Sequence, residues 1–203
     1  MKSREFSPKE KAIYQAVIEL FREGADLNNL TVAEITGKAG IGKGTAYEYF
    51  TDKEEMIAKA VFYHTEEFCD ELYLQVEKEA ALPDKIDLVL RRLEEEVTET
   101  NCIFRLIHAM TDNSMLGRKM KEIEETDTPY GMLAGEIINR IILDEKGNDG
   151  ISQEKKEYLM LSLFSGILCY GMYLQKNKNA PAEKRIAMRK QVCSGICREI
   201  MEE

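Results

Sequence analysis

The first 55 residues carry three helix-start signals, which divide this part of the chain into short helices. Ser7-Pro8-Lys9-Glu10 is a capping box with proline at the first helical position, and Thr31-Val32-Ala33-Glu34 is a second capping box. A third start lies at Asp52-Lys53-Glu54-Glu55, and Gly24 and Gly40 are the expected ends of the first two helices. The helix that begins at Thr31 is therefore only about two turns long and is followed by a tight turn.

Apolar residues recur at helical spacing through the rest of the chain. One long helix is expected to begin near residue 53 and to end before Pro83. The sequence contains no alternating strand pattern bounded by turns and no internal repeat. We therefore predict an all-α protein. The expected helices cover about residues 8–23, 31–39, 43–49, 53–81, 86–97, 102–110, 114–125, 129–143, 152–177 and 181–201.

The distribution of charge limits where a polyanion can approach. The formal net charge is −9, yet residues 1–53 carry as many basic as acidic side chains, so the whole acidic excess lies after residue 53. The front of the chain is thus the candidate for nucleic-acid binding, because the remainder repels polyanions. The charged N-terminus and the short, interrupted apolar runs predict a cytoplasmic protein without a membrane span.

The cysteine and histidine content predicts neither a metal centre nor a cofactor. The five cysteines are odd in number and scattered, which is typical of reduced thiols in a cytosol. A structural zinc site needs about four ligands, and His64 and His108 do not stand at metal-binding spacing from a cysteine. Cys193 and Cys197 share a helix face, either as a thiol switch or metal pair or as two small buried residues.

Residues 31–49 predict a helix-turn-helix motif. Thr31–Ala39 is the expected supporting helix and Lys43–Tyr49 the recognition helix, with Gly40 allowing the reversal and Ile41 filling the junction. A recognition helix presents its N-terminal end to the major groove of DNA. We therefore expect base contacts from Lys43 and Thr45.

The residues around the recognition helix suit contacts to the DNA backbone. Gly44 permits close approach, while Tyr47, Tyr49 and Lys53 can donate to phosphate oxygens, which fixes register without reading sequence. Glu48 either faces a cytosine amino group or points away from DNA. The predicted DNA-binding set is Thr31, Lys43, Gly44, Thr45, Tyr47, Tyr49 and Lys53.

This stretch resembles the N-terminal DNA-binding domain of the TetR family of bacterial transcriptional regulators. The resemblance covers about residues 8–60. It departs from the family at Gly42, where serine is frequent, and at Glu48, where aromatic or basic residues are frequent. The matching residues are Thr31-Val32-Ala33-Glu34-Ile35, Ala39-Gly40-Ile41, Lys43-Gly44-Thr45, Tyr47, Tyr49-Phe50 and Lys53-Glu54-Glu55.

The resemblance implies a homodimeric repressor that a small molecule releases from its DNA operator. Residues 1–52 would be the DNA-binding domain and residues 53–203 the effector-binding and dimerisation domain. The long helix at 53–81 would link the two, and the helices at 152–177 and 181–201 would form the dimer. The expected pocket, for an apolar or aromatic effector, is bounded by His64, Phe68, Phe104, His108, Tyr130 and Leu133, which could equally fill a solid core.

Other functions fit the sequence less well. An enzyme is not expected, because Gly40–Thr45 (GIGKGT) lacks the full phosphate-loop pattern and no nucleophile–base set is apparent. A helical interaction protein without DNA binding is one alternative. A thiol-sensing regulator that uses Cys193 and Cys197 is another.

Overall fold

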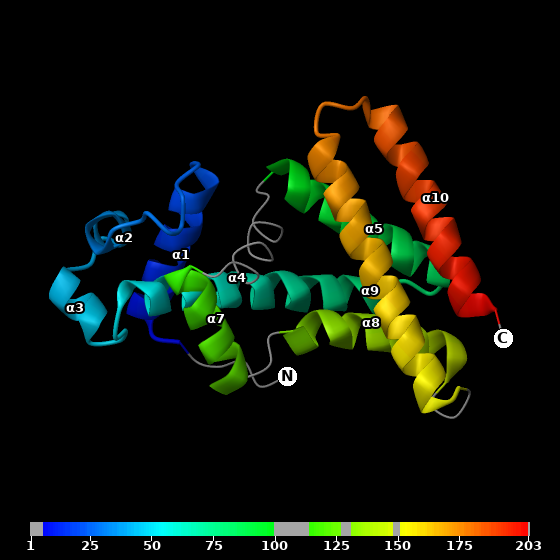
Figure 1. Ribbon diagram of the computed structural model, residues 1–203, viewed down its shortest axis with the longest axis horizontal. Coiled ribbons are helices and arrows are strands. Elements are labelled where there is room, and N and C mark those ends of the chain that lie inside the picture. Colours follow the sequence, from blue (N-terminus) through cyan, green and yellow to red (C-terminus); the bar gives the residue numbers. More distant parts are fainter. Residues whose placement is uncertain (1–5, 100–113, 127–130, 148–150, 203) are drawn as a thin grey trace. The chain divides into compact units, whose positions relative to one another are not determined.

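The computed structural model describes residues 6–99, 114–126, 131–147 and 151–202, and within these ranges every regular element is a helix (Figure 1). The all-α prediction is therefore confirmed. The helices are α1 (Pro8–Arg22), α2 (Val32–Ala39), α3 (Lys43–Tyr47), α4 (Lys53–Val76), α5 (Leu82–Glu99), α7 (Met115–Thr126), α8 (Gly131–Lys146), α9 (Gln153–Lys176) and α10 (Ala182–Met201).

Several predicted helix bounds were wrong. The recognition helix α3 ends at Tyr47 instead of Tyr49, and α4 ends at Val76 instead of about residue 81. Helix α5 begins at Leu82 instead of about residue 86, and α8 ends at Lys146 instead of about residue 143. Pro83 lies inside the first turn of α5, where the missing N–H has no intrahelical partner to lose. The predicted helix at 102–110 lies outside the described residues.

The chain divides into two compact units, which consist of residues 1–67 with 102–130 and of residues 68–101 with 131–203. Helix α4 contributes its first part to one unit and its last part to the other. The boundary between the two compact units falls inside α4, after residue 67. The predicted boundary after residue 52 instead separates a DNA-binding part from an effector-binding part. That functional boundary stays a prediction.

The first unit has one apolar core that joins α1, α2, α3 and the start of α4. The buried core residues include Ile13, Val17 and Ile35, and α7 adds Leu116 and Met120. Burying such side chains is the main force that holds short helices in place, since isolated helices of this length are marginal in water. The core therefore fixes the position of α2 and α3.

In the second unit, α5 packs against α8, α9 and α10. A partly buried ion network joins α5 to α10. The Glu94 carboxylate accepts from Arg185 Nε at 2.9 Å and from Arg189 Nη1 at 2.7 Å, and Arg189 Nε donates to Asp87 at 2.9 Å. Charge-assisted bonds of this kind are about twice as strong as neutral ones and fix the register of the two helices.

Helix α9 is unusually apolar for a helix that is so little buried within the chain. Among the described residues, it alone is long and apolar enough to cross a membrane by length and composition. Only 28% of its most apolar stretch is buried inside the chain. Its exposed or half-buried apolar stripe consists of Leu161, Phe164, Leu168 and Met172.

Candidate nucleic-acid interface

The supporting helix α2 is fixed at its start by the predicted capping box. Thr31 Oγ1 accepts from the Glu34 N–H at 3.2 Å, and the Glu34 carboxylate accepts from the Thr31 N–H at 2.8 Å. The Thr31 hydroxyl also donates to the Glu34 carboxylate at 2.6 Å, and this bond, followed by the one from the Thr31 N–H, lowers the pKa of Glu34. The box is therefore held by a charged carboxylate at neutral pH. Ile35 is fully buried beneath it, which orients the helix on the core.

Gly40 makes the turn between α2 and α3. Its φ of +66° lies in the left-handed region, which residues with a side chain rarely adopt. The N–H of Ile41 then donates to the carbonyl of Thr36 at 3.0 Å, so the end of α2 is closed by the chain that follows it. Gly42 starts α3 without a side-chain cap bond.

Burial orients the recognition helix α3. Ala46 is fully buried, and Phe50, just after the helix, is buried in the same core. The opposite side of α3 therefore faces solvent, with Lys43 and Gly44 exposed and Tyr47 53% exposed. Thr45 is half-buried. A solvent-facing lysine, glycine and tyrosine on a rigidly anchored helix suit close approach to a duplex.

Two predicted backbone contacts have protein partners. Tyr49 is half-buried and packs against the core, although the local sequence pattern shows no apolar stripe that it would join. The Lys53 ammonium donates to the carbonyl of Asn28 at 3.0 Å and lies 3.6 Å from the Glu54 carboxylate. An ammonium carries three donors, so this arrangement leaves donor capacity for a phosphate.

Helix α4 begins at the start predicted from Asp52, and Thr51 adds hydrogen bonds that sequence reasoning did not single out. Asp52 Oδ1 accepts from the Glu55 N–H at 2.7 Å, and the Glu55 carboxylate accepts from the Thr51 N–H at 2.6 Å. Burial alone raises the pKa of Glu55, but hydrogen bonds from Lys59 and Thr51 outweigh it and lower the pKa to about 2. Thr51 and Glu55 are four residues apart, one more than in a capping box, so the capping pattern did not indicate their contact.

The predicted effector residues are only partly covered by the structure. His64 and Phe68 are half-buried and one turn apart on α4, and the Arg92 guanidinium lies 5.6 Å from the centre of the Phe68 ring. Leu133 lies in α8. Phe104, His108 and Tyr130 lie outside the described residues, so this pocket stays a prediction.

A family model of bacterial regulatory proteins, tetR family, matches residues 13–60. These residues cover most of α1, all of α2 and α3, and the start of α4, which form the helix-turn-helix and its support. Residues 13–60 therefore form a DNA-binding domain of the tetR family. The chain is a DNA-binding regulator with the helix-turn-helix described above.

Solved structures of TetR-like fold extend the likeness over nearly the whole chain. The fatty acid degradation regulator FadR from Bacillus halodurans matches at 17% identity and a TM-score of 0.68, covering 95% of this chain and 96% of that one. FadR from Bacillus subtilis, solved in complex with stearoyl-CoA, matches at 17% identity and a TM-score of 0.66, covering 92% and 96%.

A TetR transcription regulator from Haloarcula marismortui matches at 16% identity and a TM-score of 0.68, covering 94% of this chain and 97% of that one. At such identities the likeness establishes the fold of the chain. No curated protein sequence matches this chain.

Proposed function

We propose that this TetR-family regulator is a homodimeric repressor that binds a near-palindromic operator and leaves it when a small molecule binds. The observation that carries the DNA-contacting part is the exposed face of α3, with Lys43, Gly44 and Tyr47 held outward by the buried Ala46. TetR-family proteins are transcriptional regulators and are generally not enzymes. The proposed compartment is the cytoplasm, where the DNA is.

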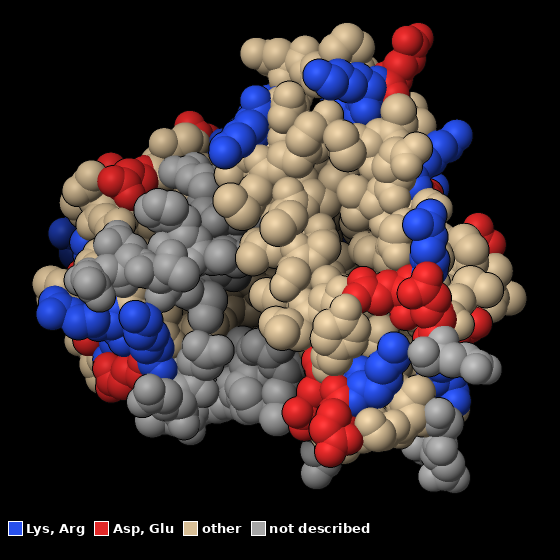
Figure 2. Space-filling model, turned by 45° about the vertical axis from the view of Figure 1, so that its right-hand side comes forward, with Lys and Arg blue, Asp and Glu red and all other residues tan. Residues whose placement is uncertain are grey.

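The α9 stripe supports the homodimer. Leu161, Phe164 and Met172 are exposed on one side of α9, and an apolar stripe of this length on a helix marks an interface. Figure 2 turns forward the side of the molecule that carries α9 and α10, and a broad area of it shows no charged side chain. A second copy of the same stripe is the simplest complementary surface, because two-fold contacts are self-complementary.

A two-fold dimer determines the form of the operator. Two recognition helices related by a two-fold axis read half-sites about 34–36 Å apart, or a multiple of that distance. The operator is then a near-palindrome. The alternative function, a helical interaction protein without DNA binding, predicts no operator.

The proposed effector is apolar or aromatic. One structurally similar protein was solved with stearoyl-CoA, whose acyl chain belongs to this chemical class. The acidic excess after residue 53 disfavours a strongly anionic effector. Binding of the acyl chain and binding of the anionic head group must therefore be tested separately. To release DNA, the effector must bind the DNA-free arrangement of the protein more tightly than the DNA-bound one. The ratio of these two affinities limits how far the effector can lower DNA binding.

A gel shift with the DNA upstream of the protein's own gene tests the repressor proposal. We expect a shifted complex that survives excess unrelated DNA. If unrelated DNA competes equally well, the protein does not recognise a specific operator in this DNA. If no complex forms even at low salt, the result favours the helical interaction protein.

Effector chemistry is tested on the same complex with three additions. Stearoyl-CoA and stearate carry the acyl chain, and CoA carries the head group alone. We expect release by at least one acyl compound and none by CoA. Release by CoA alone would overturn the apolar effector, and no release by any member of a broad apolar and aromatic panel would overturn ligand control.

A thiol-sensing role for Cys193 and Cys197 is not favoured. Burial raises the pKa of the Cys193 thiol to about 12, and it also raises the pKa of Cys197. The thiolate is the form that reacts with oxidants, so both side chains are poor redox sensors at neutral pH.

A further inference from the structure

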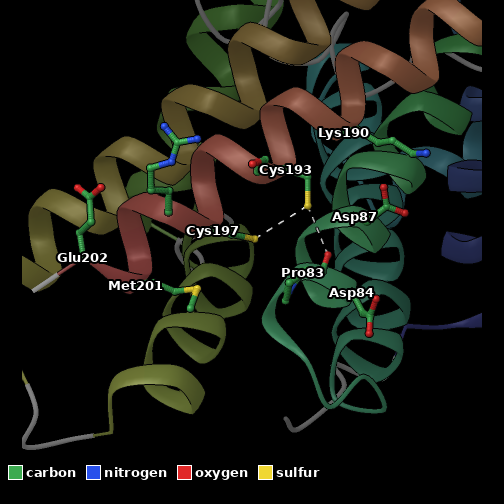
Figure 3. A pocket seen from close by; sticks show the side chains of 10 residues that line it. Pro83, Asp84, Asp87, Lys190, Cys193, Cys197, Met201 and Glu202 are labelled. Atoms are coloured by element: carbon green, nitrogen blue, oxygen red, sulfur yellow. Dashed lines mark hydrogen bonds between the residues drawn. The ribbon is translucent and has the colours of Figure 1, made fainter.

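Helices α5 and α10 line an open pocket of about 700 Å³ in the second unit. We call it the α5–α10 pocket. Pro83, Asp84 and Asp87 line it from α5, and Cys193, Cys197 and Met201 line it from α10 (Figure 3). The pocket is open to solvent on one side, so a small ion can enter without unfolding of the unit.

Three sulfur atoms lie along one side of this pocket. Cys193, Cys197 and Met201 are spaced by four residues each, which places them on one face of α10 (Figure 3). Cys193 Sγ lies 4.0 Å from Cys197 Sγ and 3.4 Å from the carbonyl oxygen of Pro83. If Cys193 and Cys197 served only to fill the α5–α10 contact, other small residues would do so equally well. Such residues would not place two thiols in mutual contact beside a thioether.

The separation of the thiols suits chelation of one ion. With metal–sulfur bonds of about 2.3 Å, an ion that bridges sulfurs 4.0 Å apart makes an S–metal–S angle of roughly 120°. That angle is the one expected for trigonal coordination. A third donor from the same helix face would complete such a site, and the Met201 thioether is one turn further along α10.

The donor set favours one class of metal ion. Thiolate and thioether ligands select soft ions such as Cu(I). Zinc needs about four nitrogen, sulfur or oxygen ligands, and the described ranges contain no group of three or more His, Cys, Asp and Glu residues that could hold a metal. Calcium and magnesium require oxygen ligands throughout.

We propose that the α5–α10 pocket binds one Cu(I) ion through the thiolates of Cys193 and Cys197 and the thioether of Met201. Each thiol loses its proton as its sulfur bonds to the ion, so binding releases two protons and copper stays at +1. The proposal does not depend on DNA binding, because the site lies wholly within the second unit.

The test is an anaerobic titration of the full, reduced protein with Cu(I) in competition with a chromogenic chelator. We expect one tightly held ion per protomer. Cys193→Ser and Cys197→Ser should each weaken binding by more than about 100-fold, which exceeds the effect of losing an outer-shell partner. Met201→Leu, which keeps the apolar bulk, should weaken it less.

The matched control is Cys169→Ser, because Cys169 is an exposed free cysteine on α9, outside the pocket. It should bind Cu(I) like the unmutated protein. If Cys169→Ser loses the ion while Cys193→Ser keeps it, copper binds an exposed thiol and the proposal is overturned.

X-ray absorption on the unmutated, copper-loaded protein gives a second test that needs no variant. Two or three sulfur neighbours around copper would support the site. A shell of nitrogen or oxygen neighbours alone would overturn it, even if the serine variants failed to fold.

Discussion

At the scale of single residues, the proposed interface depends on which side chains are free to meet DNA. Lys43 and Tyr47 are exposed, whereas Tyr49 is packed on the core and Lys53 already donates to the Asn28 carbonyl. The exposed side chains of Lys43 and Tyr47 can therefore contact DNA without giving up a contact within the protein. Lys53 contributes to two things at once, the loop before α2 and the proposed phosphate contact.

Lys53→Ala is expected to weaken binding to operator and to random DNA alike. Removing one phosphate contact should reduce the slope of log affinity against log salt by about 0.9. Lys178→Ala removes the same charge from an exposed position far along the chain and should leave the slope unchanged. If Lys53→Ala binds with an unaltered slope, Lys53 only supports the loop at Asn28.

Lys43→Ala should instead change sequence preference. A lysine that reads a guanine edge discriminates against the wrong base pair by about 1–3 kcal/mol. We expect preference to relax at one base pair in each half-site, measured by binding to single-substituted operators. An equal loss of affinity for every sequence would make Lys43 a phosphate contact.

At the scale of elements, local signals located the helix starts better than the helix ends. The capping boxes at Ser7 and Thr31 are present as predicted, because their partners are three residues apart. The end of α4 was misplaced, since a helix end also depends on tertiary packing, and Pro83 is tolerated in the first turn of α5. The contact of Lys53 with Asn28 joins residues 25 positions apart, and no local pattern encodes it.

The turn before α4 predicts a pH dependence. The pKa of Glu55 falls from the usual 4.5 to about 2, so its carboxylate stabilises the fold fully above about pH 4.5 and ceases to do so as pH falls towards 2. Glu55→Gln should therefore be less stable than the unmutated protein at pH 7. The difference between the two should shrink between pH 4.5 and 2. Denaturant unfolding across this range measures it, and a constant difference would show that Glu55 acts through packing.

At the scale of the whole molecule, the apolar stripe on α9 is the proposed contact between two copies of the chain. Gly166, a small residue on the same helix, does not belong to the outward face. A Cβ at Gly166 would lie 3.4 Å from Ile196 of α10 in the same protomer. Enlarging Gly166 would disturb a single protomer, so it is not a clean test of the dimer.

Leu161→Glu is the sharper variant for the dimer. Leu161 is 67% exposed within one protomer, and a charge there should convert the dimer to a monomer at micromolar concentration. Leu74→Glu is the matched control, because Leu74 is 57% exposed on α4, away from the stripe. Sedimentation velocity distinguishes the species. An unmutated protein that sediments as a monomer would contradict the proposed assembly.

The central proposal is that two copies of α3 read DNA across a two-fold axis. Selection of duplexes from a random library by the unmutated protein tests it, and the operator sequence need not be known for this experiment. We predict enrichment of a near-palindrome whose half-site centres are about 10–10.5 base pairs apart or a multiple of that spacing. With Lys43→Ala, the enriched near-palindrome should lose its preference at one base pair in each half-site. Enrichment of an asymmetric site, or of no sequence at all, would contradict it.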